Sequence, residues 1–188
     1  DRGGRVCGPD MKPDDFSEHR FPAKGNACIF GASGGVGSAL VSALATGLPE
    51  WTIHAGSRTG TVRECMNVRP FRFDLEDEGA IAGSLQRIGQ AGPLDLVIIA
   101  TGVLHGDGLE PEKTYRAFDA DAAQRVFARN TIGPALIAKH ALPLLPRKAR
   151  GVFAAISAKV GSIADNGLGG WHSYRASKAA LNMLLKNF

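Results

Sequence analysis

Short apolar runs with strand character alternate along most of this chain with longer segments of helical periodicity. The expected elements, in chain order, are a strand over 27–30, a helix from about 36, strands over 51–56 and 68–74, a helix across the 80s, a strand over 95–101, a helix over 121–145, a strand over 151–157 and a helix from about 172. Neighbouring parallel strands need long crossover connections, which helices supply. The alternation therefore predicts an α/β fold with a doubly wound parallel sheet, covered by helices on both faces.

The length of 188 residues, 44% of them apolar and 21% charged, suits one buried core rather than two domains. Residues 1–26 are polar, rich in Gly, Pro and charge, and show no apolar periodicity. We therefore expect a flexible N-terminal extension over 1–26 and a single folded domain over 27–188.

Composition also narrows the class of protein. No apolar run approaches the roughly 18 residues that a membrane span needs, so we expect a soluble, cytoplasmic protein that binds no membrane. Cys7, Cys28 and Cys65 lack metal-ligand spacing, which favours free thiols in a reducing compartment over a redox or metal role. The mild net charge of +4 comes without a basic tract, which argues against a nucleic-acid partner.

The segment FGASGGVGSAL, residues 30–40, places four glycines between a predicted strand and a predicted helix. Without Cβ atoms the backbone can turn tightly and bring free N–H groups of the helix N-terminus against a pyrophosphate. The predicted dinucleotide contacts in this loop are Gly31, Ser33, Gly35, Val36 and Gly37. A tight turn without a ligand is the alternative, because the spacing GxxxGxG differs from the commoner GxGxxG.

The segment SYRASKAALN, residues 173–182, contains Tyr174 and Lys178 four positions apart. On a helix this spacing puts both side chains on one face. A nearby ammonium favours the phenolate, so we expect the pKa of Tyr174 to lie below its usual value of about 10, which would make the phenol a usable proton donor. A surface tyrosine and lysine on an amphipathic helix is the alternative for an isolated pair of this kind.

Together, these two segments resemble the short-chain dehydrogenase/reductase family, over nearly everything from Ala27 to Phe188. Within the family, VGSIADNGLGGWHSYRASKAALN is similar to the branch of carbonyl reductases that includes the C-factor and sniffer proteins. The resemblance implies a Rossmann-type fold, NAD(P)(H)-dependent oxidation or reduction at an alcohol or carbonyl carbon, and an active site of Asn, Ser, Tyr and Lys.

Asn130, in FARNTIGPALIAKHALPLL, matches the family's helix asparagine. Pro134 has no N–H, so the carbonyl of Asn130 loses its helical partner and the helix should kink there. The resemblance implies that this carbonyl holds a water in a proton relay to Lys178. The alternative is a polar residue on a helix face beside an incidental proline.

The serine of the family pattern is displaced in this chain. The segment ISAKVG has Ala158 at the usual place, with Ser157 before it and Ser162 after it. Side chains alternate along a strand, so Ser157 can serve only if the strand end twists or bulges, whereas Ser162 lies in a loop. We favour Ser157 as the residue that polarises the carbonyl, and Ser162 stays open.

The end of the second strand indicates the type of cofactor. In HAGSRTG no carboxylate stands where NAD-using relatives grip the ribose hydroxyls, and Arg58 stands just beyond. A guanidinium suits a 2′-phosphate and could also stack on adenine. We expect NADP(H) to be preferred, with NAD(H) possible.

Two further strand ends match the family. Asp74 in RFDLED corresponds to the residue that meets the adenine amine, with Leu75 beside it, although a helix N-cap would give the same sequence. Thr101 and Gly102, in IIATGV, stand where the family has Asn-Ala-Gly and keep small side chains next to the cofactor.

The segment 103–118 is polar and is expected to overhang the pocket. His105 within it could touch substrate, although a solvated loop histidine is the favoured interpretation.

The combined prediction is hydride transfer between a nicotinamide and a carbonyl or alcohol, with Tyr174 as general acid or base and Lys178 gripping the nicotinamide ribose. A regulator or sensor that holds NADP(H) with little turnover is the alternative, favoured by Ala158 and opposed by the intact Tyr174 and Lys178. Family members continue beyond this last helix, so the resemblance implies that the C-terminal part of the fold is missing from this chain. It also implies a homodimer or homotetramer.

Overall fold

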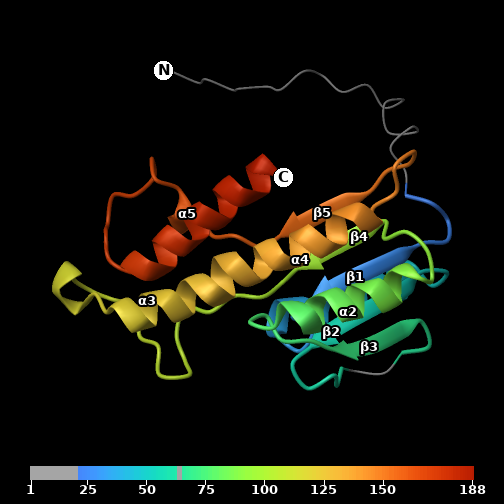
Figure 1. Cartoon of the computed structure of the whole chain (residues 1–188), viewed down its shortest axis with the longest axis horizontal. Helices are drawn as coiled ribbons and strands as arrows, with labels where there is room; N and C mark the ends of the chain where they lie inside the picture. Colours follow the sequence, from blue (N-terminus) through green and yellow to red (C-terminus); the bar gives the residue numbers. More distant parts are fainter. Residues whose placement is uncertain (1–20, 63–64) are drawn as a thin grey trace, which may run out of the picture.

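Five parallel strands form the sheet at the centre of the molecule (Figure 1). The computed structural model describes residues 21–62 and 65–188. The strands are β1 (Asn26–Phe30), β2 (Thr52–Ser57), β3 (Val68–Arg72), β4 (Leu96–Ile99) and β5 (Val152–Ala155). Their order across the sheet is β3-β2-β1-β4-β5, and every neighbouring pair is parallel. The predicted doubly wound α/β fold is confirmed.

Helices connect β1 to β2, β3 to β4 and β4 to β5, and a last helix follows β5. In the described part of the chain they are α1 (Gly35–Gly47), α2 (Glu78–Gly89), α3 (Ala120–Phe127), α4 (Gly133–Ala141) and α5 (His172–Asn187). The final helix begins at the predicted residue. Within the described ranges, none of the helices has both the length and the apolar character needed to cross a membrane.

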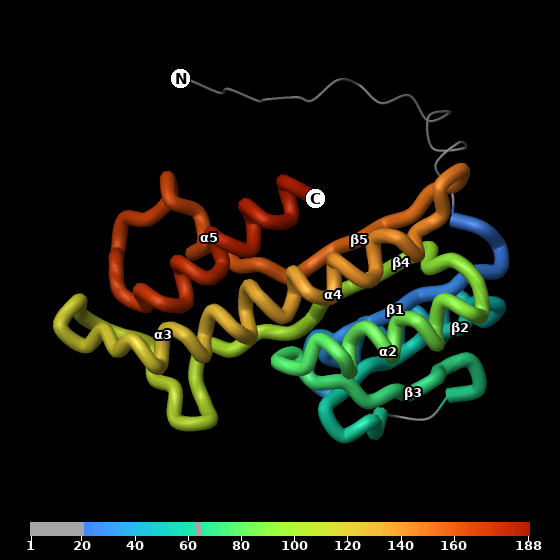
Figure 2. The backbone as a smooth tube through the Cα atoms, in the orientation of Figure 1, coloured from blue at the N-terminus to red at the C-terminus, as the bar shows by residue number. Residues whose placement is uncertain are grey.

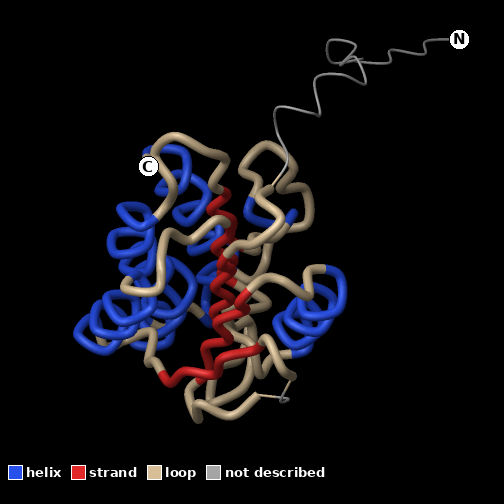
Figure 3. Tube along the Cα trace, turned by 90° about the vertical axis from the view of Figure 1, so that its right-hand side faces the viewer, coloured by secondary structure: helices blue, strands red, loops and turns tan. Residues whose placement is uncertain are grey.

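Both faces of the sheet are buried because successive side chains of a strand point to opposite sides. Along β1, Cys28 and Phe30 belong to one apolar cluster, while Ala27 and Ile29 belong to a second. Side chains of α2 and α4 complete the first cluster, and side chains of α1 complete the second. Figure 3 shows the sheet edge-on with helices on both sides. This two-sided burial explains why the central strands β1 and β4 consist almost entirely of apolar residues.

The predicted single helix over 121–145 is interrupted. A π-helical turn, Ala128–Ile132, separates α3 from α4, and the N–H of Gly133 donates to the carbonyl five residues earlier. Pro134, the next residue, has no N–H to donate to the carbonyl of Asn130, so regular α-helical hydrogen bonding is also interrupted on this side of the turn. The helix expected over 121–145 is thus divided, and the irregularity expected beside Pro134 takes the form of a π-helical turn.

The described residues of the predicted N-terminal extension contact the domain, and residues 1–20 lie outside the described part. The ring of Phe21 packs edge-to-face on Trp51, with 5.3 Å between ring centroids. The indole N–H of Trp51 donates to the carbonyl of Pro22 at 3.0 Å. These contacts hold residues 21 and 22 against Trp51, shortly before β1 begins.

Two of the three cysteines lie in the described part of the chain, and Cys7 lies outside it. Cys28 is buried, Cys65 is exposed, and both are free thiols as predicted. Burial raises the pKa of the Cys28 thiol, so this residue packs as a small apolar side chain.

Candidate active site

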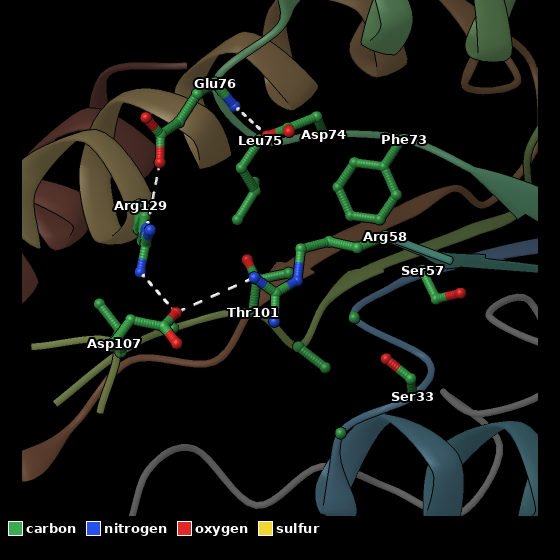
Figure 4. Close-up of a pocket in the computed structure, with 15 residues that line it drawn as sticks. Ser33, Ser57, Arg58, Phe73, Asp74, Leu75, Glu76, Thr101, Asp107 and Arg129 are labelled. Atoms are coloured by element: carbon green, nitrogen blue, oxygen red, sulfur yellow. Dashed lines mark hydrogen bonds and ion pairs between the residues drawn. The ribbon is translucent and has the colours of Figure 1, made fainter. Parts of the chain in front are cut away.

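A cavity of about 340 Å3 opens where the carboxyl ends of β1 and β4 lie side by side (Figure 4). The helix after β1 covers one face of the sheet and the helices after β4 cover the other, so this is the switch point where ligands of such folds bind. The predicted cofactor contacts that line it are Gly31, Ser33, Arg58, Asp74, Leu75, Thr101 and Gly102. The predicted contacts outside its lining are Gly35, Val36, Gly37, Tyr174 and Lys178.

The glycine loop is a tight turn that requires two of its glycines. Gly31 has φ +88°, and a Cβ there would lie 2.8 Å from the carbonyl oxygen of Ala100. A Cβ on Gly37 would lie 2.1 Å from the carbonyl oxygen of Gly31. The loop thus brings the start of α1 directly onto the end of β1.

Gly35 has a different explanation, because a Cβ there would meet no atom of the described residues within 4 Å. The residue opens α1, and no described side chain caps the helix at Gly34. Its first N–H groups therefore stay available for an anionic group, and no side chain covers the approach. This bare helix end beside the cavity fits the diphosphate of a dinucleotide, so the alternative of a turn without a ligand leaves Gly35 unexplained.

Four charged side chains form the rim of the cavity: Arg58, Glu76, Asp107 and Arg129. Arg129 Nε lies 3.1 Å from Glu76 Oε1, and its Nη1 lies 3.1 Å from Asp107 Oδ2. Arg58 Nη1 lies 3.9 Å from the same Asp107 oxygen. The hydrogen bond to Glu76 is the main reason why the pKa of Arg129 lies above its ordinary value.

Asp74 lies at the cavity wall and is not a helix cap. Its Oδ1 accepts the N–H of Glu76 at 3.0 Å, while Asp77 caps α2 by accepting the N–H of Ala80 at 2.9 Å. The N-cap interpretation of Asp74 is therefore wrong. Its neighbour Leu75 also lines the cavity.

Tyr174 and Lys178 lie on α5, one turn apart. The ammonium of Lys178 lies 6.0 Å from the centre of the Tyr174 ring and donates to the carbonyl of Ile156 at 2.9 Å. Lys178 is buried, at 3% exposure. A Cβ on Gly102 would lie 3.2 Å from Lys178 Nζ, so the ammonium sits directly behind the cavity wall. The interpretation of this pair as surface residues is wrong for Lys178.

The predicted lowering of the Tyr174 pKa is wrong for this structure. Burial raises the pKa of the Tyr174 phenol above its ordinary value and lowers the pKa of the Lys178 ammonium. Removal of the phenol from water disfavours its anion, and the Lys178 ammonium, 6.0 Å from the ring centre, donates to the Ile156 carbonyl instead.

Asn130 is fully buried and joins three parts of the site. Its amide nitrogen donates to the Val103 carbonyl at 2.8 Å and to Ser177 Oγ at 3.1 Å, and its amide oxygen accepts the Val103 N–H at 2.7 Å. The side chain therefore fixes the chain after β4 against α5. Sequence reasoning assigned the backbone carbonyl a role and missed this role of the side chain.

The two candidate serines lie in different places. Ser157 lies two residues after the end of β5, next to Ile156, whose carbonyl Lys178 contacts. Its Oγ is buried without a hydrogen-bond partner among the described residues. Ser162 lines a separate cavity of about 230 Å3 with residues such as His172 and Arg175. Thr101 Oγ1 is also buried and unpartnered within the described part. His105 is exposed and lines neither of these two cavities.

The start of α5 is capped from the segment after β4. The buried carboxylate of Glu112 accepts hydrogen bonds from Ser173 Oγ and from the Ser173 N–H, at 3.2 Å for the latter. The N–H of Trp171 donates to the Glu112 carbonyl at 2.6 Å. Burial alone would raise the pKa of Glu112, but the hydrogen bonds from Ser173 outweigh it and the pKa lies below its ordinary value.

Sequence reasoning did not name six residues of the cavity wall: Gly34, Ser57, Phe73, Glu76, Ala100 and Arg129. Two more, Val103 and Asp107, belong to the segment 103–118 that was expected to overhang the pocket. Several follow strand ends, and that position was a usable signal. No local sequence pattern marked Arg129 as a residue of the cavity, because its partner Glu76 lies 53 positions away.

Known proteins resemble this chain in sequence. The family model described as short chain dehydrogenase matches residues 25–188. The chain is 33% identical over 116 residues to 1-hydroxy-2-glutathionyl-2-methyl-3-butene dehydrogenase of Rhodococcus sp. (strain AD45), covering 61% of this chain and 48% of that protein. It is 37% identical over 98 residues to C-signal of Myxococcus xanthus, covering 51% and 55%. The chain thus spans about half the length of these relatives.

Solved structures share the fold. The carbonyl reductase Sniffer of Caenorhabditis elegans superposes with a TM-score of 0.74 at 24% identity, over 85% of this chain and 76% of that one. A short-chain dehydrogenase/reductase from Burkholderia multivorans with bound NADP superposes with a TM-score of 0.74 at 24% identity, over 87% and 71%. The family model confirms the predicted family resemblance, and these structures confirm the fold.

Proposed function

Because the chain belongs to the short-chain dehydrogenase family, we propose that it binds NADP(H) in the cavity beside the glycine loop and interconverts a carbonyl compound and its alcohol. The observation that carries the proposal is the position of Lys178. Its buried ammonium stands directly behind Gly102 in the cavity wall, on the same helix as Tyr174. The cavity thus borders the helix end proposed to bind an anion, and the ammonium behind its wall lies 6.0 Å from the ring centre of Tyr174, the proposed proton donor.

The proposed cofactor site uses this chain's own groups. The N–H groups at the start of α1 would bind the diphosphate, and Asp74 and Leu75 would border the adenine. Arg58 at the rim would pair with a 2′-phosphate, which favours NADP(H) over NAD(H). The NADP bound to the Burkholderia multivorans protein of the same fold supports this preference.

The bound nicotinamide supplies or accepts the hydride. Tyr174 would move the proton at the substrate oxygen, as donor in reduction and acceptor in oxidation. Its raised pKa keeps the phenol protonated near neutral pH, which suits donation to a carbonyl oxygen. Lys178 would bind the nicotinamide ribose, from its place behind Gly102.

Ser157 is the proposed residue for polarising the carbonyl. Its buried, unpartnered hydroxyl in the described structure needs an acceptor or donor, whereas Ser162 faces another cavity. Asn130 would position this site by holding Val103 and Ser177 together. A relay water on its carbonyl stays a prediction, as does assembly into a homodimer or homotetramer.

A cofactor-binding protein with little turnover is the second candidate. Ala158 at the usual serine position favours it. The two candidates share the nucleotide site and differ only in chemistry.

Both candidates are tested by measuring NADPH binding at equilibrium alongside NADPH consumption with a panel of aldehydes and ketones. The proposed function predicts saturable binding and consumption that depends on the carbonyl compound. Binding without consumption across the panel would favour the second candidate. Absence of binding would reject both.

A further inference from the structure

A tight hairpin projects Asp107 toward the rim of the cavity. The N–H groups of Gly106 and Leu109 each donate to the other's carbonyl at 3.0 Å, which closes a two-residue turn. Asp107 and Gly108 have φ of +54° and +74°, the signature of a type I′ turn, for which Asp-Gly is a preferred sequence. Leu109 is 2% exposed and anchors the hairpin. Figure 2 shows this segment, in yellow-green, as a narrow loop below α3.

The turn holds the Asp107 carboxylate between two guanidinium groups, as Figure 4 shows. One oxygen lies 3.1 Å from Arg129 Nη1 and 3.9 Å from Arg58 Nη1. Arg129 also pairs with Glu76, whereas Asp107 is the carboxylate within ion-pair distance of Arg58 in the described structure. The group proposed to bind a 2′-phosphate is thus already beside a negative charge.

We infer that Asp107 is a specificity-determining residue that opposes the 2′-phosphate and so restrains the preference for NADP(H) over NAD(H); this inference rests on the proposed function. A 2′-phosphate brings nearly two negative charges to Arg58 and would be repelled by the carboxylate beside it. The neutral 2′-hydroxyl of NAD(H) meets no such repulsion. Arg129, whose Nη1 lies 3.1 Å from the Asp107 carboxylate, would still hold Asp107 in place when Arg58 turns to a phosphate.

The substitution Asp107→Asn removes this charge with little change in the backbone, because Asn-Gly suits a type I′ turn as well as Asp-Gly does. We expect the dissociation constant of NADPH to fall about fivefold at low salt, with that of NADH within about twofold of wild type. Titration calorimetry of the whole chain with each nucleotide measures both constants. Glu110→Gln is the matched control, since it removes the same charge from the same segment at an exposed residue outside the cavity lining.

The outcomes separate this inference from the proposed function. If wild type binds NADPH and NADH and Asp107→Asn leaves their ratio unchanged, the inference is wrong while the nucleotide site stands. An equal gain in the Glu110→Gln control would assign the effect to net charge and would also overturn it. If wild type binds neither nucleotide, the proposed function fails.

Discussion

The buried layer behind the cavity wall, which we call the floor, and the rim of the cavity differ in how their polar groups are held. The floor, comprising Asn130, Ser177 and Lys178, is at most 3% exposed, and its hydrogen bonds run between elements far apart in the sequence. The rim, comprising Arg58, Glu76, Asp107 and Arg129, is formed by ion pairs whose side chains are 25 to 79% exposed.

The difference in burial predicts that the two groups of residues tolerate substitution differently. A buried hydrogen-bonding group left without its partner costs roughly 1–3 kcal/mol, so the floor tolerates few changes. Exposed ion pairs contribute about 0–1 kcal/mol each, so the rim can change and adjust affinity in small steps. In this account the floor and α5 position the reacting groups, and the rim sets which nucleotide binds.

The glycine loop offers the change with the largest expected effect. Gly37→Ala would put a Cβ 2.1 Å from the Gly31 carbonyl oxygen, so α1 would have to move away from β1. We expect NADPH affinity to fall by more than about a hundredfold and the free energy of unfolding to fall by about 1–3 kcal/mol. Calorimetric binding and urea unfolding measure the two effects.

Gly35→Ala is the matched control for that experiment. Its Cβ has open space within the described structure, so the free energy of unfolding should stay at or above that of wild type. NADPH affinity should still fall, because the methyl group would cover the helix end proposed for the diphosphate. Unchanged NADPH affinity in Gly35→Ala would show that the diphosphate does not bind at this helix end.

The cap of α5 offers a smaller effect with a defined pH dependence. Because the pKa of Glu112 is lowered in the folded chain, its contribution to stability is present above the unfolded pKa and is lost as pH falls through the folded value. Glu112→Gln should therefore lower the free energy of unfolding by about 1–2 kcal/mol at pH 7. Urea unfolding of both proteins between pH 7 and pH 3 measures the difference.

The difference should shrink as the wild-type carboxylate becomes protonated. Glu110→Gln, at an exposed carboxylate two residues earlier, should leave stability close to wild type at every pH. A Glu112→Gln difference that stays constant down to pH 3 would show that the charge of Glu112 does not stabilise α5.

The sequence predicted the elements well because their signals are local. The apolar run at 27–30, the glycines after it and the Tyr174 and Lys178 spacing each depend on a few neighbouring residues. The same locality allowed Pro134 to predict an irregular helix. It could not predict the π-helical form, which depends on hydrogen bonds along the whole turn.

The parts that sequence reasoning missed depend on distant partners. Arg129 and Glu76 meet across 53 positions, and Asn130 and Ser177 across 47. The direction of the Tyr174 pKa shift was predicted wrongly for a related reason. Helical spacing revealed the nearby ammonium but not the burial of the phenol or the Ile156 carbonyl that Lys178 contacts.

The central claim, that Tyr174 is the proton donor of an NADPH-dependent reaction, is tested most directly by the NADPH consumption rate of Tyr174→Phe relative to wild type. The account predicts a loss of about 10² to 10⁴-fold in rate, with the dissociation constant of NADPH within about twofold of wild type. Consumption by Tyr174→Phe at close to the wild-type rate would contradict it.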